Sequence, residues 1–422
     1  MEYINKDLGS YKLHLINTDK FKTVTIKVIF RSPIVKEEIT IRNVLCDILL
    51  QGTKNYNSRR KLNIKSEELY SANVNTNVLR NGNYITSSFT MSVLNDKYTE
   101  KDNLLESIKF LSEILFNPDV ENKKFNQSRL DIVKHTIKNN INSIKENPVR
   151  YAITKLNESY SKGPISYRLC GYVKDLDLID TSNLYDYYLK FINNSLIDIY
   201  VVGEIDCKEI TKNIKNSFKF RTLNKERKSI YLDVVKARRK KLIVKESINN
   251  IQSTVAVMCN ISKLTKYERD YVLPIYNLIL GGGIDSKFFK NIREKYSLCY
   301  TIRSYSRVLD NTLIITAGID KKNYKKTVEL INKYFLEMRR GKFEKKDIRV
   351  AKEYLITSID DIYEDSNSII NYNYSADLLK LDGLDVRKDK INKVKKNEII
   401  RLSKKIKIDT IFNLEGVLTD ED

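Results

Sequence analysis

Short β-branched stretches and longer amphipathic segments alternate along the chain. Four stretches are apolar and rich in Val, Ile and Thr, a pattern that predicts strands with one or both faces buried; they cover 23–30, 198–203, 254–261 and 312–319. Four other segments repeat apolar residues at three- and four-residue spacing, which predicts amphipathic helices; they cover 103–116, 125–144, 324–338 and 347–362. We therefore expect an α+β protein with long helices and short strands.

The order of these elements repeats at an offset of about half the chain. In the first half the strand at 23–30 leads to a predicted helix near 38–50, then to a Gly-Thr pair and a basic helix. In the second half the strand at 254–261 leads to a predicted helix near 266–280, then to three glycines and another basic helix. Such self-similarity indicates duplication of one structural unit.

The length of the chain also favours two domains. A chain of 422 residues exceeds the size at which a single core keeps growing, and 41% hydrophobic residues suffice for ordinary globular cores. Between the halves lies a strongly charged stretch without Gly or Pro, which is typical of an exposed linker. We expect homologous domains at 1–222 and 243–422, joined by a linker at 223–242.

The chain is basic, with 75 Lys and Arg against 54 Asp and Glu, a net charge of +21. The basic residues are spread along the chain, so they form either a solvated surface or a field that attracts an acidic partner, an acidic peptide or nucleic acid. Nucleic acid is not expected, because there is no zinc-finger spacing, GXXG loop or aromatic RNP run.

Cysteine usage and hydropathy indicate a cytoplasmic protein. The five cysteines are far apart and form no CxxC pair, which favours reduced core thiols over a disulfide framework. The N-terminus contains acidic residues and no apolar signal region, and no window approaches ~18 consecutive apolar residues. We therefore predict no membrane association.

Several motifs, in order, resemble the insulinase/pitrilysin family of zinc metallopeptidases, which includes mitochondrial processing peptidase. They are NVLCDILLQGTKNYNSRRKL (43–62), the segment 184–206, LGGGIDSKFFKNIREKYSLCYTIRSYS (280–306) and the segment 341–365. The resemblance covers nearly the whole chain. It implies two α/β-sandwich domains of the processing-peptidase type, each a mostly antiparallel sheet packed with helices.

In active members of that family the helix corresponding to 43–47 carries H-x-x-E-H. Two histidines four residues apart share a helix face and bind zinc, and the glutamate activates the metal-bound water. Here the two ligand positions are Asn43 and Asp47, and the position of the base is Cys46. The family's third ligand falls at Thr136, with a one-residue uncertainty that would make it His135.

The histidine count excludes the family's zinc site from this chain. Only His14 and His135 are present, so two histidines cannot lie on the 43–47 helix. We interpret these positions as a degenerate metal site on a surviving scaffold, with a polar helix face and a buried structural Cys46. An unorthodox metal site from Cys46, Asp47 and His135 is the alternative. An apolar stripe of the helix is expected to face the core; it consists of Ile41, Val44, Leu45, Ile48 and Leu49.

The second half keeps a pair of residues that the resemblance implies for substrate binding. Arg293 and Tyr300 match an arginine and a tyrosine that, in the family, contact the substrate near the scissile carbonyl; a guanidinium and a phenol both donate hydrogen bonds to oxygens. The alternative is a surface Arg293–Glu294 pair and a tyrosine packed in the sheet. The run at 281–283 (Gly281, Gly282, Gly283) resembles the glycine-rich loop of noncatalytic processing-peptidase subunits, but could also be a helix C-cap. It is no phosphate loop.

The resemblance is strongest to noncatalytic bacterial subunits, and some relatives are linked to translation-factor modification or peptide maturation. It implies a catalytically inactive, substrate-contacting subunit of a heterodimeric zinc metallopeptidase. The chain would complete a peptide-binding chamber, need no cofactor itself, and pair with a partner that carries H-x-x-E-H and zinc, or with itself when alone. The alternatives are an assembly protein of the same fold, an enzyme with an altered metal site, and a nucleic-acid-binding module.

Overall fold

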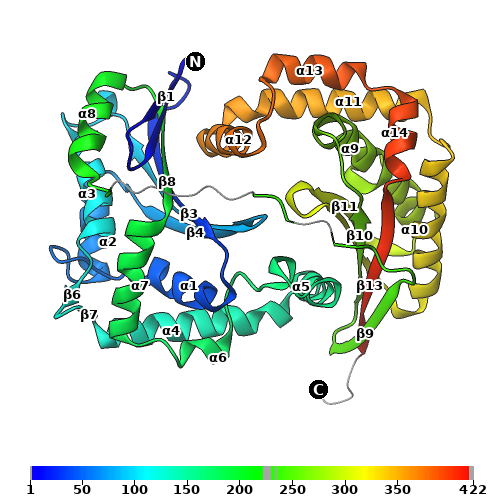
Figure 1. Ribbon diagram of the computed structural model, residues 1–422, viewed down its shortest axis with the longest axis horizontal. Helices are drawn as coiled ribbons and strands as arrows, with labels where there is room; N and C mark the ends of the chain where they lie inside the picture. The colour runs from blue at the N-terminus through cyan, green and yellow to red at the C-terminus, as the bar shows by residue number, and fades with distance from the viewer. Residues whose placement is uncertain (1, 222–229, 233–234, 418–422) are drawn as a thin grey trace. The chain divides into compact units, whose positions relative to one another are not determined.

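The computed structural model describes residues 2–221, 230–232 and 235–417 (Figure 1). The described residues form two compact units, each with its own sheet and hydrophobic core. Unit 1 contains Met1–Asn142, Arg168–Ile230 and Tyr363–Tyr374, and unit 2 contains Ser143–Tyr167, Tyr231–Ile362 and Ser375–Asp422. Each unit therefore includes a segment from the other half of the sequence.

The sheet of unit 1 has six strands in the order β1-β2-β8-β3-β5-β4. All neighbours are antiparallel except β2 and β8. The strands are β1 (Glu2–Asp7), β2 (Lys12–Asn17), β3 (Thr23–Pro33), β4 (Val74–Asn81), β5 (Tyr84–Leu94) and β8 (Leu196–Gly203), with a separate ribbon of β6 (Val120–Glu121) and β7 (Lys124–Phe125). The predicted β3 and β8 are confirmed, but β3 and β5 reach eleven residues, longer than expected.

The sheet of unit 2 repeats this plan in the order β11-β12-β10-β13-β9, with β13 and β9 as its parallel pair. The strands are β9 (Leu242–Asn249), β10 (Ser253–Ile261), β11 (Cys299–Arg307), β12 (Thr312–Ile319) and β13 (Ile406–Val417). Read from β9, this order matches β2-β8-β3-β5-β4 of unit 1, with β1 as an addition. The duplication inferred from the sequence is thus present in the strand pairing, and the mostly antiparallel sheets are confirmed.

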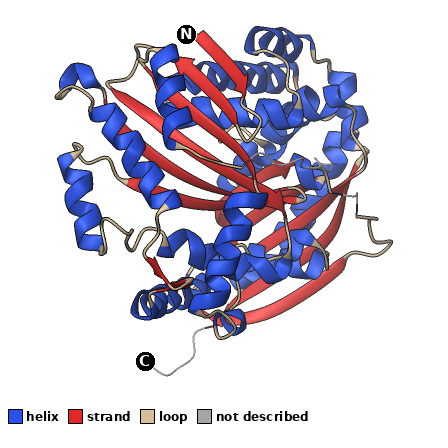
Figure 2. Cartoon of the chain, turned by 60° about the vertical axis from the view of Figure 1, so that its left-hand side comes forward, coloured by secondary structure: helices blue, strands red, loops and turns tan. Residues whose placement is uncertain are grey.

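Amphipathic helices cover the sheets of both units (Figure 2). Unit 1 contains α1 (Ile39–Ile48), α2 (Arg59–Glu68), α3 (Asn103–Phe116), α4 (Gln127–Asn142), α6 (Val173–Leu176), α7 (Thr181–Asn194) and α8 (Cys207–Ser217). Unit 2 contains α5 (Pro148–Tyr160), α9 (Leu273–Asn277), α10 (Tyr324–Arg339), α11 (Lys345–Asp360), α13 (Leu384–Lys393) and α14 (Lys396–Ser403), and α12 (Ser366–Leu379) has residues in both units. No helix of the described part of the chain is long and apolar enough to cross a membrane.

Helix α5 and the first part of α12 belong to the unit opposite their own half of the sequence. Helix α5 packs on β10 and β13 of unit 2, where the hydroxyl of Tyr160 accepts a hydrogen bond from Asn260 Nδ2 at 2.9 Å. The first residues of α12 cover the sheet of unit 1, where Ser366 Oγ lies 2.8 Å from Thr25 Oγ1 and the buried Ile369 adds apolar area. The sequence pattern alone did not predict this exchange.

The predicted linker at 223–242 lies partly outside the described residues, which exclude 222–229 and 233–234. Its described part is anchored by hydrogen bonds. The Ile230 carbonyl accepts from the Asn83 amide at 3.0 Å, and Arg238 donates through its backbone amide to Asp409 at 2.7 Å. Arg238 also donates to the Ser159 carbonyl at 2.9 Å, so this stretch connects α5 and β13 within unit 2.

Candidate functional site

Helix α1 presents the predicted apolar stripe to the core of unit 1. Val44, Leu45, Ile48 and Leu49 are buried, and Ile41 is half-buried against the same core. Their spacing places them on one side of the helix, which packs against α4 and α7. The predicted apolar stripe is therefore confirmed. Its packing directs the opposite face of α1, which carries Asn43, away from the core.

Asn43 is held by two backbone carbonyls. Its Nδ2 donates to the Ile39 carbonyl and to the Leu169 carbonyl, each at 2.8 Å. Both amide protons are therefore engaged, and the half-buried side chain joins α1 to a segment more than a hundred residues later in the chain. The amide nitrogen is thus used as a donor within the protein, and the remaining neutral Oδ1 is neither the imidazole nitrogen nor the thiolate sulfur that zinc sites use.

The same segment is fastened to the first turn of α1. Thr40 Oγ1 donates to Asp175 Oδ2 at 2.8 Å and accepts from the Tyr172 amide at 3.0 Å. Gly171 has φ +90, and a Cβ there would lie 2.8 Å from Thr40 Oγ1. The close approach and the left-handed backbone both require glycine. The polar face of α1 therefore packs against residues 169–175 through specific hydrogen bonds.

Cys46 and Asp47 occupy different environments. The Cys46 thiol is 1% exposed, and burial raises its pKa to about 11, although a hydrogen bond with Ser87 and the charge of Arg42 oppose the shift. Asp47 is half-buried, and burial raises its pKa while Arg59 lowers it. A thiol that resists ionisation is a poor zinc ligand, because the thiolate binds the metal. The expectation of a buried Cys46 is confirmed.

The third-ligand position is exposed on α4. Thr136 Oγ1 donates back to the Ile132 carbonyl at 2.9 Å, and His135 Nδ1 lies 3.4 Å from Asn139 Nδ2. The other histidine, His14, is fully buried on β2, stacked on Tyr200 with ring centroids 4.1 Å apart. Within residues 2–221, 230–232 and 235–417, no three His, Cys, Asp or Glu side chains are placed to hold a metal. The residues present do not fit zinc.

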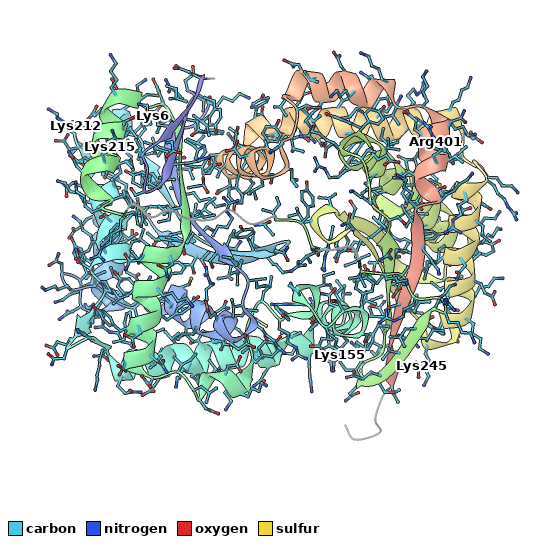
Figure 3. The ribbon with its side chains drawn as sticks, in the orientation of Figure 1. Lys6, Lys155, Lys212, Lys215, Lys245 and Arg401 are labelled. Carbon is cyan, nitrogen blue, oxygen red and sulfur yellow. The ribbon has the colours of Figure 1, made fainter. Side chains whose placement is uncertain are left out.

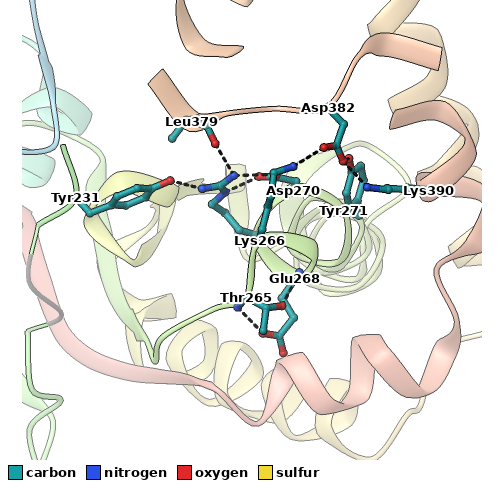
Figure 4. Close-up of polar contacts among 10 residues, drawn as sticks. Tyr231, Thr265, Lys266, Glu268, Asp270, Tyr271, Leu379, Asp382 and Lys390 are labelled. Atoms are coloured by element: carbon teal, nitrogen blue, oxygen red, sulfur yellow. Dashed lines mark hydrogen bonds and ion pairs between the residues drawn. The ribbon is translucent and has the colours of Figure 1, made fainter. Parts of the chain in front are cut away.

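In unit 2 the helix predicted near 266–280, the counterpart of α1, consists of η5 (Glu268–Val272), α9 and η6 (Leu278–Gly282). The basic helix that follows the glycines is η7 (Phe288–Lys295), and the three η segments are π-helical. An ion network holds the start of this region (Figure 4). Lys266 donates to Asp382 at 2.7 Å and lies 3.2 Å from the buried Asp270. Hydrogen bonds from Lys266, Lys390 and Tyr271 keep the pKa of Asp382 well below its usual range. The network therefore secures the helical region that precedes Arg293.

Two of the three glycines allow close packing. A Cβ on Gly281 would lie 2.4 Å from Phe288 Cδ2, and one on Gly282 would lie 2.6 Å from Asn277 Nδ2. Gly283 is extended, with φ −152, and neither of the others has positive φ. Gly283 is the C-cap of η6, so the glycines do end the helix, as the C-cap alternative expected, but without a left-handed residue. Gly281 and Gly282 form the end of η6, and only Gly283 lies in the connection that follows.

Arg293 and Tyr300 are both exposed. The Arg293 guanidinium lies 4.6 Å from the centroid of the Phe289 ring, and no ion pair joins it to Glu294 or to another carboxylate in the part of the chain that is described. Tyr300 is 62% exposed, so the alternative of a tyrosine packed in the sheet is wrong. Burial raises the pKa of Cys299, the first residue of β11, to about 11, and the charge of Arg293 opposes this shift.

Tyr300 lies at an irregularity of β11. Cys299 pairs with Ile319 and Thr301 with Gly318, so Tyr300 is an extra residue opposite β12. This is a β-bulge, a device that redirects a side chain. No hydrogen bond of its hydroxyl occurs among the described residues.

The positive charge is distributed over both units (Figure 3). In unit 1, Lys6 donates to Thr211 of α8 at 2.8 Å, close to other lysines of that helix. In unit 2, Lys155 and Lys245 lie 3.6 Å and 3.7 Å from Glu246 and Glu415. Charge alone therefore does not single out a site.

Comparison with known proteins agrees with this geometry. Residues 179–355 match the family model "Peptidase M16 inactive domain". The chain is 29% identical over 429 residues to "Probable inactive metalloprotease YmfF" of Bacillus subtilis (strain 168), with 99% of each chain covered. The chain is a homologue of the M16 peptidases.

Solved structures show the same two-unit fold as this M16 homologue. A conserved protein from Enterococcus faecalis V583 matches with a TM-score of 0.91 and 26% identity over 100% of both chains. A peptidase M16 inactive domain from Pseudomonas fluorescens matches with a TM-score of 0.79 and 14% identity, again over 100% of both chains. The family resemblance and the fold class predicted from the sequence are confirmed.

Proposed function

We propose that this M16 homologue is the catalytically inactive, substrate-contacting subunit of a heterodimeric zinc metallopeptidase. In this proposal a partner subunit supplies H-x-x-E-H and zinc, and this chain supplies part of the peptide-binding surface through Arg293 and Tyr300. The chain itself holds no cofactor, and the complex acts in the cytoplasm.

The degenerate metal positions support the first half of the proposal. Asn43 donates to two carbonyls, Cys46 is buried with a raised pKa, and Thr136 donates to its own helix. These side chains are used within unit 1, so they leave no water-activating centre. The name of the B. subtilis relative and the description of the matching family model agree with this interpretation.

The proposed substrate contact is supported by the exposure of Arg293 and Tyr300. Both are exposed, and no salt bridge or hydrogen bond engages their polar ends within the described residues. A guanidinium offers five donors and a phenol offers one, so together they can bind carbonyl oxygens of an extended peptide or an oxyanion formed by a partner's zinc centre. Neither group hydrolyses a peptide unaided.

The test is reconstitution. The purified chain should contain no stoichiometric zinc and should cleave no peptide, and addition of an H-x-x-E-H homologue that co-purifies with it should produce hydrolysis. Arg293→Ala or Tyr300→Phe should lower kcat/KM of the complex about tenfold or more, since loss of one transition-state donor typically costs at least that factor. Circular dichroism of each variant checks that it is folded.

The chain offers matched controls on α11. Arg349 is an exposed arginine whose nearest carboxylate is 3.8 Å away, and Tyr354 is 59% exposed. Arg349→Ala and Tyr354→Phe should leave activity unchanged. Full activity of an Arg293→Ala, Tyr300→Phe double variant would exclude the proposed role, and hydrolysis by the zinc-loaded single chain would exclude the division of labour. A stable complex with no peptidase activity would favour an assembly protein.

A further inference from the structure

Helix α10 exposes a leucine between two basic residues. One face of the helix is buried in the core of unit 2, and the outer face carries Lys333, Leu336 and Arg340 at three- and four-residue spacing. Leu336 is 47% exposed, so a large apolar side chain lies in water between two positive charges. Lys333 and Arg340 are about 10 Å apart along the helix axis.

Two more basic residues come from α14, which packs beside α10 (Figure 1). Arg401, labelled in Figure 3, and Lys404 are both exposed and lie three residues apart on one side of α14. Arg339 ties α10 to the end of α14, because it donates to the Ile406 carbonyl at 2.7 Å and to the Ser403 carbonyl at 3.5 Å. The two helices thus form one surface, which we call the basic face: Lys333, Leu336, Arg340, Arg401 and Lys404.

The turn after α10 fixes this arrangement. Arg340 is the C-cap of α10, and Gly341 follows with φ +68, the left-handed conformation that ends many helices. A Cβ on Gly341 would lie 2.7 Å from Ile400 Cδ1. The end of α10 is therefore packed directly on Ile400, the sequence neighbour of Arg401.

The nearby carboxylates are used elsewhere in unit 2. Glu337 accepts from Lys287 at 3.2 Å, and Glu329 lies 3.8 Å from Lys326. Glu398 accepts from the backbone amide of the α14 N-cap at 2.7 Å. No ion pair joins the four cations of the basic face to a carboxylate within the described part of the chain. Since guanidinium groups bind carboxylates bidentately, the face suits an acidic partner.

The exposed leucine favours an acidic protein segment over a nucleic acid. Single-stranded nucleic acids bind by stacking their bases on exposed aromatic rings, but the rings on α10 next to Leu336, Tyr334 and Phe335, are each only 4% exposed. A leucine instead offers apolar area to an aliphatic side chain. A basic face with an apolar centre therefore matches an amphipathic helix whose glutamates surround one apolar residue.

We propose that the basic face binds an acidic amphipathic helix of a partner protein. An apolar side chain of that helix packs on Leu336, and its glutamates pair with the surrounding basic residues. The face shares no residue with the proposed substrate contact, so this inference goes beyond the proposed function.

The test uses the full chain and fluorescein-labelled peptides of about 16 residues, long enough to form a helix. The acidic peptide carries glutamates at three- and four-residue spacing around one central leucine. A second peptide has serine in place of that leucine, and a third has glutamine in place of every glutamate. Fluorescence anisotropy should show that the acidic peptide binds about fivefold more tightly than the serine peptide and about tenfold more tightly than the glutamine peptide. Added salt should reduce only the second difference.

Variants identify the side chains responsible. Leu336→Ser should abolish the difference between the leucine and serine peptides. Arg340→Gln and Arg401→Gln should each weaken binding of the acidic peptide about two- to fivefold, with partial recovery in Arg401→Lys. Val386→Ser on α13 is a matched control, because Val386 is also 47% exposed, and Arg349→Gln removes a positive charge from α11. Both controls should leave binding unchanged, and circular dichroism checks that every variant is folded.

Three results would overturn the inference. They are equal binding of the acidic and glutamine peptides, a leucine preference that survives Leu336→Ser, and no measurable binding of the acidic peptide at about 1 mM. An oligodeoxythymidine of about 16 nucleotides that binds more tightly than the acidic peptide, and is lost in Arg401→Gln, would assign the face to nucleic acid instead. Partner-dependent hydrolysis that requires Arg293 and Tyr300 is measured separately and is compatible with each of these results.

Discussion

Substitution of Asn43 tests whether this side chain has a structural role, by joining α1 to the Leu169 carbonyl, or is a metal ligand. Asn43→Ala removes two hydrogen bonds of 2.8 Å, but the Ile39 carbonyl keeps its helical partner, so only the Leu169 carbonyl loses a donor. At about 1 kcal/mol for a typical bond, we expect destabilisation of about 1–2 kcal/mol. Asn43→Asp should cost more, about 2–4 kcal/mol, because a carboxylate would face two carbonyl oxygens in a half-buried site.

The metal-ligand interpretation predicts the opposite order. An aspartate at position 43 would lie four residues before Asp47, where two carboxylates repel in the absence of a cation but could share one. Zinc would then stabilise the Asn43→Asp variant in proportion to its affinity. Without a metal site, zinc and EDTA should leave its stability unchanged.

The assay is urea unfolding followed by circular dichroism, together with hydrogen exchange of the segment 168–172. Asn373 is a matched control, because its Nδ2 donates only to the Ile369 carbonyl, at 2.8 Å, within α12. Asn373→Asp should cost less than Asn43→Asp and should leave exchange at 168–172 unchanged. If Asn43→Asp were as stable as wild type, or were stabilised by zinc, the structural role of Asn43 would be refuted.

Two further predictions follow from charge and burial. Asp382→Asn should lower stability at pH 7 by about 1–3 kcal/mol, through loss of charge-assisted hydrogen bonds from two lysines and a tyrosine. Because the folded-state pKa of Asp382 is well below its unfolded value, its contribution is fully present above pH ~5 and is lost progressively as pH falls toward the folded-state pKa, so the stability gap between the two proteins should narrow steadily from pH ~5 to pH ~2; a gap independent of pH would contradict this. Cys46 and Cys259, whose pKa values burial raises, should resist iodoacetamide in the folded protein at pH 8, whereas the half-buried Cys170 should react sooner; mass spectrometry of the labelled peptides measures the order.

The spacing of apolar residues predicted helices and strands well where burial of one face determines the element. The helix at 103–116 and the strand at 312–319 have the bounds expected from apolar spacing. The duplication was predicted from the sequence, and the repeated segments form equivalent strands of the two sheets, but the order of strands within each sheet was not predicted. The absence of a zinc motif needed only the histidine count.

Features that depend on distant partners were not predictable. The amide of Asn43 is fixed by the Leu169 carbonyl, and nothing near Asn43 in the sequence indicates that contact. The need for glycine at 281 comes from Phe288 and Ser304, which approach it only in the folded unit. Arg238 lies in a stretch whose charge resembles a linker, yet its donors are used by α5 and β13.

The exchange of helices between the halves has a consequence for synthesis of the chain on the ribosome. Ile369 and Ile370 are fully buried in unit 1, so the first sheet has an uncovered face until translation has passed residue 374. Most of the nascent polypeptide therefore emerges before the N-terminal unit is complete. Such delayed closure leaves apolar surface available for aggregation, and a chaperone that shelters the nascent chain would increase the yield of folded protein.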